Sequence, residues 1–233
     1  HKEIYSQFED RTISTFNADN FFKGLFIFSI GLFKKVVIAD AFSEWADTGY
    51  LHANELNFFS AWFTSLSYTF QLYFDFSAYA DMAIGTAFMM NLRLPINFNS
   101  PYKADSIQDF WRRWHITLSH FLRDYVYIPL GGNKNSEFVT CRNIMLTFLI
   151  GGLWHGASWM FVLWGAAHGI ALVLHRLWQK LQFPLPTWLA VFVTFNFVNL
   201  TWVLFRAEDL PTAKAIYLGM LGVNGVELPS FLA

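Results

Sequence analysis

Long apolar runs separated by short polar segments make up most of this chain. Residues 21–38 form the first run, residues 58–90 form a longer one, and residues 187–205 form the most uniform one before Arg206. A helix needs about 20 predominantly apolar residues to cross a bilayer. The pattern therefore predicts an all-α protein with several membrane-spanning helices, arranged as a single helical membrane domain over residues 1–233.

Polar segments lie at both ends of the chain. Residues 1–20 contain no apolar signal-peptide core, and we expect them to be a solvated lead-in with Asn17 or Asp19 capping the first helix. Residues 208–233 predict a short helix followed by a polar turn. Because the chain begins at His1, we expect it to be a fragment with further spans upstream.

The apolar run at 58–90 is too long for one span and carries two acidic residues, Asp75 and Asp81. It predicts a span followed by a short helix or a bend. An acidic group inside a membrane is costly, so these carboxylates are expected to be functional or paired. The alternative is an interfacial helix end at which they reach water or the backbone.

Residues 91–102 contain two prolines among Asn and Ser and predict a loop. A helix is expected to begin at Ser106, with Ser106 as N-cap and Asp109 as its acidic partner. Asp109 also lies four residues before Arg113, a spacing suited to an ion pair. His115 is expected on the apolar side of this helix. The residues sharing that stripe are Trp111, His115, Leu118 and Leu122.

Residues 144–174 contain no Asp, Glu, Lys or Arg, and His155 lies near the middle of this stretch, after Gly151 and Gly152 and before Gly156. An imidazole can exchange a proton near neutral pH, which makes His155 a candidate proton-transfer group. The alternative is a core histidine bonded to a neighbouring helix. His168, thirteen residues later, can share a site with His155 only if the chain bends near Gly156.

Composition supports a membrane protein and excludes some functions. Apolar residues make up 55% of the chain and charged residues 14%, against roughly 25% charged in an average soluble domain. With 16 basic and 17 acidic side chains, there is no basic field that would suggest nucleic-acid binding. Cys141 is the one cysteine, and no histidine pair has the spacing of a metal site, so we expect no metal.

Charge also predicts an orientation. Residues 39–57 carry acidic but no basic side chains, whereas residues 91–114 carry Arg93, Lys103, Arg112 and Arg113. By the positive-inside rule the first segment faces outward and the second inward. Residues 107–130 are then expected to enter the membrane and return, with protein around their irregular backbone. Arg112 and Arg113 are either part of the inner positive girdle or ligands for the phosphates of an acyl donor.

Several long motifs occur in an order that strongly resembles the membrane-bound O-acyltransferase family. The resemblance is greatest to the branch that acts in alginate O-acetylation and weaker to the teichoic-acid D-alanylation branch. It covers residues 20 to 180. The motifs are the segment at 71–85, NFNSPY (97–102), FWRRWHITLS (110–119), LRDY (122–125), YIPLGGN (127–133), GGLWHG (151–156) and WGAAHG (164–169).

The resemblance implies a multi-pass fold with re-entrant or short helices around a tunnel, of which this chain is the C-terminal half. It places the catalytic histidine at His155 and the second active-site position at His115, which are expected to line one cavity. Other residues in matching motifs are expected to contact substrates. These are Arg112, Arg113, Trp154, His168 and Asp75.

The function implied is transfer of an acyl group, acetyl above all, from a cytoplasmic thioester such as acetyl-CoA. The acceptor would be a hydroxyl of an extracytoplasmic polysaccharide such as alginate, or an acyl-accepting periplasmic or extracellular protein that relays the group. His155 would act as general base, with no bound cofactor, in the inner membrane of a bacterium. The alternatives are a transporter or channel, or a non-catalytic scaffold of a polysaccharide secretion complex.

Overall fold

Helices are the regular elements throughout the part of the chain that the computed structural model describes, residues 5–9, 13 and 15–227. The predicted all-α class is confirmed. Residues 1–4, 10–12 and 14 of the polar lead-in and residues 228–233 of the tail lie outside the described residues. The chain divides into two compact units, residues 1–46 with 67–97 and residues 47–66 with 98–233. The single domain over 1–233 stays a prediction.

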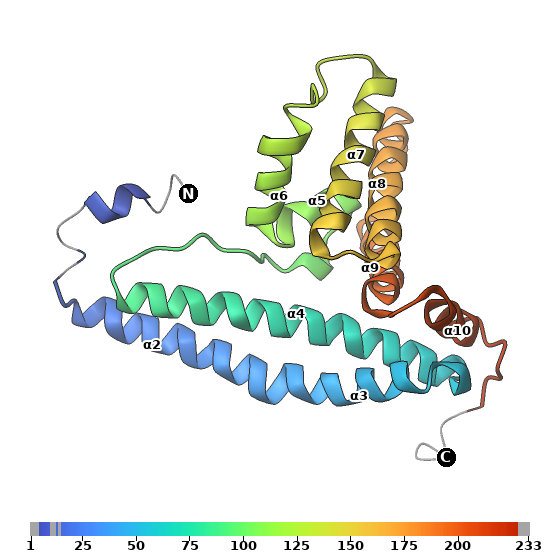
Figure 1. The fold of residues 1–233 in the computed structure, drawn as a ribbon, viewed down its shortest axis with the longest axis horizontal. Coiled ribbons are helices and arrows are strands. Elements are labelled where there is room, and N and C mark those ends of the chain that lie inside the picture. Colours follow the sequence, from blue (N-terminus) through green and yellow to red (C-terminus); the bar gives the residue numbers. More distant parts are fainter. Residues whose placement is uncertain (1–4, 10–12, 14, 228–233) are drawn as a thin grey trace. The chain divides into compact units, whose positions relative to one another are not determined.

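The first unit is built on two long helical segments that lie side by side (Figure 1). One runs through α2 (Ala18–Phe33), the π-helical segment η3 (Lys34–Ala39) and the start of α3 (Asp40–Leu51), and the other is the later part of α4 (Phe58–Met89). As predicted, Asn17 caps α2, because its side chain accepts the backbone N–H of Asn20 at 3.0 Å.

The segment at 58–90 is one uninterrupted helix of 32 residues, so the predicted short helix or bend was wrong. At 1.5 Å per residue α4 is roughly 48 Å long, which exceeds the hydrocarbon thickness of a bilayer. Asp75 and Asp81, which suggested a boundary, lie within the helix. They do not interrupt it because the neighbouring segment supplies each of them with a cation.

These cations are consecutive lysines of η3. Lys34 Nζ lies 2.6 Å from a carboxylate oxygen of Asp81, and Lys35 Nζ lies 2.7 Å from Asp75 and 2.9 Å from Asp40. The sequence left open whether the two carboxylates are functional, paired or at an interfacial helix end. In the structure each is paired with a lysine. A π-helical turn widens the backbone locally and changes the face on which the following side chains lie.

The second unit contains most of the short helices. After the 91–102 segment, which is a loop as predicted apart from the one-turn η5 (Pro101–Lys103), the elements follow in chain order. They are α5 (Ile107–Arg113), α6 (Ile116–Leu122), the π-helical η6 (Arg123–Tyr127), α7 (Glu137–His155), α8 (Trp159–Lys180), α9 (Thr187–Arg206) and α10 (Leu210–Met220). Short η4 (Ala53–Glu55) and the start of α4 also belong to this unit.

Within the described residues, α8 and α9 are long and apolar enough to cross a membrane, by length and composition. The α9 span agrees with the predicted run at 187–205. Buried indole and phenyl rings from α5, its C-cap residue Trp114, α8 and α9 form the core of this unit. Trp164 and Trp202 are stacked at 5.8 Å and Phe110 and Trp114 at 5.7 Å between ring centroids.

Candidate active site

The turn between α7 and α8 fixes the position of His155. The chain bends there as the sequence requires for a shared site, because α7 ends at His155 and α8 begins at Trp159 after an N-cap by Ser158. The two helices then run side by side (Figure 1). Gly152 and Gly165 face each other at the crossing, and a Cβ on either would strike a backbone carbonyl of the opposite helix. Their lack of a side chain therefore permits the close packing that sets the turn.

The His155 imidazole lies among aromatic rings. Trp154 and Phe205 have ring centroids 5.0 Å away, Trp164 lies at 5.1 Å and Phe161 at 6.1 Å. The side chain is half-buried, and it has no hydrogen-bond partner within the described residues. Packing rather than hydrogen bonding holds the ring, so both of its nitrogens remain available to a bound molecule.

His115 lies at a break between two short helices, which corrects the prediction of one helix with His115 on its apolar stripe. The helix begins as predicted, with Ser106 Oγ accepting the backbone N–H of Asp109 at 3.2 Å, but α5 ends at Arg113. His115 adopts a left-handed backbone with φ 42° and ψ 57°, and α6 begins at the next residue. Such a conformation is uncommon outside glycine and typically occurs where the surrounding structure enforces it.

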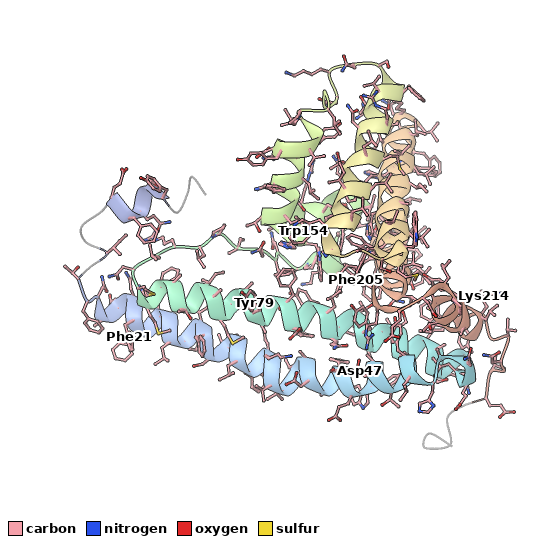
Figure 2. All side chains as sticks on the ribbon, viewed as in Figure 1. Phe21, Asp47, Tyr79, Trp154, Phe205 and Lys214 are labelled. Atoms are coloured by element: carbon pink, nitrogen blue, oxygen red, sulfur yellow. The ribbon has the colours of Figure 1, made fainter. Side chains whose placement is uncertain are left out.

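Trp154 lies against both histidines. Its ring centroid is 6.4 Å from that of His115 and 5.0 Å from that of His155, and 59% of the residue is exposed. Figure 2 labels Trp154 on α7 and Phe205 at the end of α9. His115 and His155 therefore come together around one indole, although they come from different helical segments. That they line one continuous cavity stays a prediction.

His168 is fully buried in the core of the second unit, and both of its ring nitrogens are bonded. Trp111 Nε1 donates to Nδ1 at 3.2 Å, and Nε2 lies 3.0 Å from the hydroxyl of Thr201. Its ring centroid is 4.8 Å from that of Trp164, which also touches His155. Direct contact with a substrate would require one of these bonds to break, so the predicted binding role of His168 remains a prediction.

The remaining predicted site residues differ in their surroundings. Arg113 forms the expected ion pair with Asp109, with Nε 2.6 Å from the carboxylate, and also donates to the backbone carbonyl of Asn99. Arg112 has no hydrogen-bond or ion-pair partner within the described residues. Asp75 belongs to the first unit, where Lys35 pairs with it.

Sequence reasoning missed two groups that shape this site. Phe205 forms one wall of the ring cluster around His155, and Thr201 anchors His168, yet both lie on α9, which was interpreted only as a span. No local motif marks either residue. Their importance comes from the packing of α9 against α8.

Comparison with known proteins identifies one family and several curated relatives. The profile of the MBOAT, membrane-bound O-acyltransferase family, matches residues 1–207. A peptidoglycan O-acetyltransferase of Helicobacter pylori is 58% identical over 98% of this chain and 44% of its own length. A probable alginate O-acetylase AlgI of Pseudomonas aeruginosa is 47% identical over 97% of this chain and 43% of its own length.

A more distant relative is the teichoic acid D-alanyltransferase of Bacillus subtilis, which is 31% identical over 60% of this chain and 40% of its own length. The chain thus spans less than half the length of the curated relatives it matches. Both the GGLWHG turn that carries His155 and the helix break at His115 fall within the matched region. With most of its residues matched by the profile, the chain belongs to the membrane-bound O-acyltransferase family.

Proposed function

We propose that the whole protein is a membrane O-acyltransferase in which His155 acts as general base on an acceptor hydroxyl. The observation that carries the proposal is the environment of His155, an imidazole without a hydrogen-bond partner in the described residues, held among four aromatic rings at a helix turn. Family membership supports the same interpretation. Two of the relatives above have the names of acyl-group transferases, and the third is named as a probable O-acetylase.

The proposed reaction needs one base and no redox partner. The acceptor oxygen attacks the carbonyl carbon of a thioester while its proton passes to His155, so that a C–O bond forms and the C–S bond breaks. The proton then passes from His155 to the leaving thiolate. The products are an ester on the acceptor and a free thiol, and His155 returns to its neutral form.

His115 and Trp154 are proposed to position the donor next to this base. The Trp154 ring touches both imidazoles, so a group bound against it lies near both. His115 would orient the donor or assist proton movement. Arg112, Arg113, His168 and Asp75 remain proposed substrate contacts, with Arg112 favoured because it has no protein partner in the described residues.

The names of the relatives, which refer to peptidoglycan, alginate and teichoic acid, support a proposal for the acceptor class. We propose a hydroxyl of an extracytoplasmic polysaccharide, or a partner protein that relays the acyl group to one. Peptidoglycan is favoured over alginate, because the relative named for peptidoglycan is 58% identical and the one named for alginate 47%.

The proposed setting is the inner membrane of a bacterium, crossed several times by the whole protein. The donor would be acetyl-CoA or another acyl thioester on the cytoplasmic side. Two apolar helices in the described residues and a membrane-bound family support a membrane location. The alternatives, a transporter or a secretion scaffold, are not favoured, since neither explains the two histidines around Trp154.

The decisive experiment uses the full-length protein in membranes with acetyl-labelled acetyl-CoA and purified glycans. Wild type should transfer label to one glycan, with peptidoglycan tested beside alginate. His155→Ala should lose transfer by a factor of about 10² or more, which is typical for removal of a general base. His52→Ala is the matched control, because His52 is exposed and pairs only with Glu55 in the described residues.

Native transfer rates in His155→Ala would overturn the assignment of the base. Flux of a glycan or donor across proteoliposomes, with no covalent change in either, would indicate a transporter instead.

A further inference from the structure

Two buried tryptophans of the second unit each have an indole N–H that donates to no other group. Trp164 on α8 and Trp202 on α9 are 2% and 1% exposed, and neither Nε1 has a hydrogen-bond partner in the part of the chain that the structure describes. Their rings are stacked, with centroids 5.8 Å apart and planes at 15°. A buried indole N–H normally finds a partner, so these two donors require an explanation.

The ring neighbours of Trp164 show why no protein group accepts its N–H. Phe205 and Trp111 lie at 5.2 and 5.9 Å between ring centroids, and neither side chain has an acceptor atom. His168 lies at 4.8 Å, but both of its ring nitrogens are already bonded. His155 lies at 5.1 Å with its ring plane at 87° to the indole. The proposed base and a buried N–H donor are therefore adjacent, with no hydrogen bond between them.

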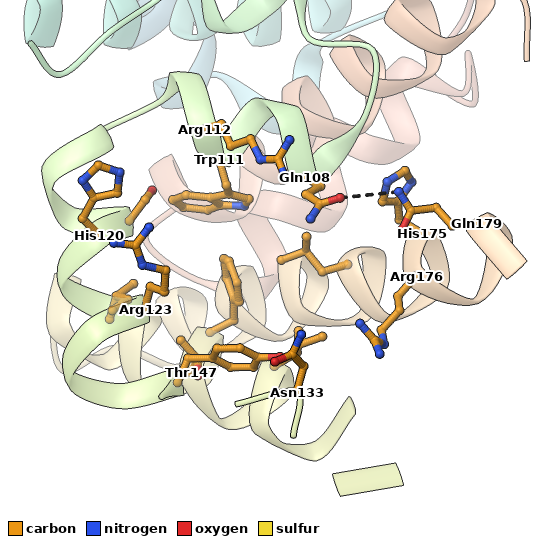
Figure 3. Close-up of a pocket in the computed structure, with 16 residues that line it drawn as sticks. Gln108, Trp111, Arg112, His120, Arg123, Asn133, Thr147, His175, Arg176 and Gln179 are labelled. Carbon is orange, nitrogen blue, oxygen red and sulfur yellow. Dashed lines mark hydrogen bonds between the residues drawn. The ribbon is translucent and has the colours of Figure 1, made fainter. Parts of the chain in front are cut away.

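The other indoles near this site differ from Trp164 in one respect each. Figure 3 labels Trp111 among the residues that line a pocket of about 470 Å³, and its N–H is already used within the core. Trp202 has no ring contact with His155 in the described residues, and its stacking partner is Trp164. Trp154 contacts His155 but is 59% exposed, so water can satisfy its N–H. Trp164 thus combines burial, an unused donor and contact with the base.

We propose that the indole N–H of Trp164 donates a hydrogen bond to the acyl carbonyl oxygen when that oxygen becomes an oxyanion. This inference rests on the proposed acyl transfer with His155 as base. As the acceptor oxygen attacks the thioester carbon, a C–O bond forms and the electron pair of the C=O π bond moves to the carbonyl oxygen. That pair then re-forms the double bond while the C–S bond breaks. The indole donates throughout and keeps its proton.

The surroundings of Trp164 suit an oxyanion donor. Donors of this kind are most effective when they are fixed in place and shielded from water before the reaction begins. The rings listed above hold the indole, and the next residue, Gly165, lies at the α7–α8 crossing, where an added Cβ would strike the carbonyl of Phe148. The backbone that carries Trp164 is therefore held against α7. Because the N–H has no partner at rest, no bond has to break when the oxyanion forms.

The test removes this N–H with the least possible change in shape, in full-length protein. Trp164→Phe is the simple variant, and Trp164→3-benzothienylalanine, which has sulfur in place of the N–H, keeps the size of the ring system. Transfer is measured from labelled acetyl-CoA to the glycan that accepts label in wild type. We expect kcat to fall about 10²–10³-fold in both, the usual loss for one oxyanion donor, with KM little changed.

The matched control is Trp202→3-benzothienylalanine, which removes an equally buried and unused N–H away from His155. It should keep the kcat of wild type. Thermal unfolding of the Trp164→3-benzothienylalanine protein separates chemistry from structure, because loss of an unsatisfied buried donor should leave Tm unchanged or raise it. A structural role for the N–H would lower Tm instead.

A transition-state analogue gives a readout that packing alone does not change. A trifluoromethyl ketone analogue of acetyl-CoA adds a hydroxyl group to form a tetrahedral alkoxide, whereas coenzyme A forms none. Wild type should bind the ketone more tightly than coenzyme A, and Trp164→3-benzothienylalanine should lose about tenfold or more of that preference while binding coenzyme A as before.

The outcomes distinguish this inference from the proposed function. Wild-type kcat in Trp164→3-benzothienylalanine, or an equal loss in the Trp202 control, would overturn the oxyanion assignment. If His155→Ala keeps native transfer while the Trp164 variants lose it, the assignment of the base fails and the oxyanion donor stands. If His155→Ala loses transfer and the Trp164 variants keep it, the donor fails and the base stands.

Discussion

The indole N–H of Trp111 donates to Nδ1 of His168 at 3.2 Å, and this bond determines the protonation form of a fully buried histidine. An indole can only donate, so Nδ1 must be unprotonated and Nε2 must carry the hydrogen. Nε2 then donates to the Thr201 hydroxyl, which donates onward to the carbonyl of Val198. Every polar group in this series of hydrogen bonds has a partner, and the series connects α5, α8 and α9.

Removing the indole N–H of Trp111, the first donor in this series of hydrogen bonds, should destabilise the second unit. Trp111→Phe leaves the Nδ1 acceptor of His168 buried and unsatisfied, which costs about 1–3 kcal/mol in free energy of unfolding. The double variant Trp111→Phe with His168→Phe removes both partners and should cost less than the sum of the two single changes. Thermal or denaturant unfolding of the purified protein in detergent measures both. Strict additivity of the two changes would show that the bond contributes nothing.

The close crossing of α7 and α8 should be intolerant of added volume. In Gly152→Val the new side chain meets the carbonyl of Phe161, so the helices must separate, at a cost of about 1–3 kcal/mol. Because the same crossing sets the turn that holds His155, acyl transfer should fall more than stability alone explains. Leu153→Ala, on an exposed position of the same helix, is the control. Equal activity of Gly152→Val and wild type would show that the crossing of α7 and α8 does not determine the position of His155.

Features encoded by neighbouring residues could be predicted from the sequence. Asn17 and Ser106 cap their helices, the Asp109 and Arg113 side chains pair four residues apart, and the chain turns after His155 at Gly156. Each depends on chemistry within one or two helical turns. The same holds for the apolar span of α9, whose composition alone identifies it.

Features that depend on distant partners could not be predicted. The break before His115 was missed because no residue pattern in the sequence marks a histidine with a left-handed backbone. The continuity of α4 was missed because Lys34 and Lys35, far away in sequence, neutralise its two acids. Phe205 reaches His155 only because α9 packs on α8.

Stability at the ends of α7 and α8 should depend on pH through Glu137. Arg176 and then Lys180 hydrogen-bond to this carboxylate and lower its pKa from the usual 4.5 to about 2. Because the pKa is lower in the folded state, the stabilisation is fully present above about pH 4.5 and is lost as the pH falls toward 2.

The variant that tests this is Glu137→Gln, compared with wild type by thermal unfolding between pH 7 and pH 3. The wild type should have the higher Tm at pH 7, and the difference in Tm between wild type and Glu137→Gln should become smaller as the pH falls below 4.5. Glu208→Gln, on the segment after α9, should show no such narrowing. A gap that stays constant down to pH 3 would mean that the ion pairs do not stabilise the fold.

The left-handed backbone of His115 allows its chemical role to be separated from its structural one. At φ 42° a β-branched side chain is disfavoured, so His115→Val should destabilise the protein by about 1–3 kcal/mol and lose transfer with it. Glycine adopts this conformation freely, so His115→Gly should keep the turn between α5 and α6 and lose only the ring contacts of the imidazole. If the imidazole positions the donor, His115→Gly should nevertheless lose most transfer while the protein stays folded. His115→Asn, which tolerates the left-handed region and keeps a polar side chain, should retain more activity than His115→Gly. Equal activity of the Gly and wild-type proteins would show that the strain at this position serves only the turn between α5 and α6.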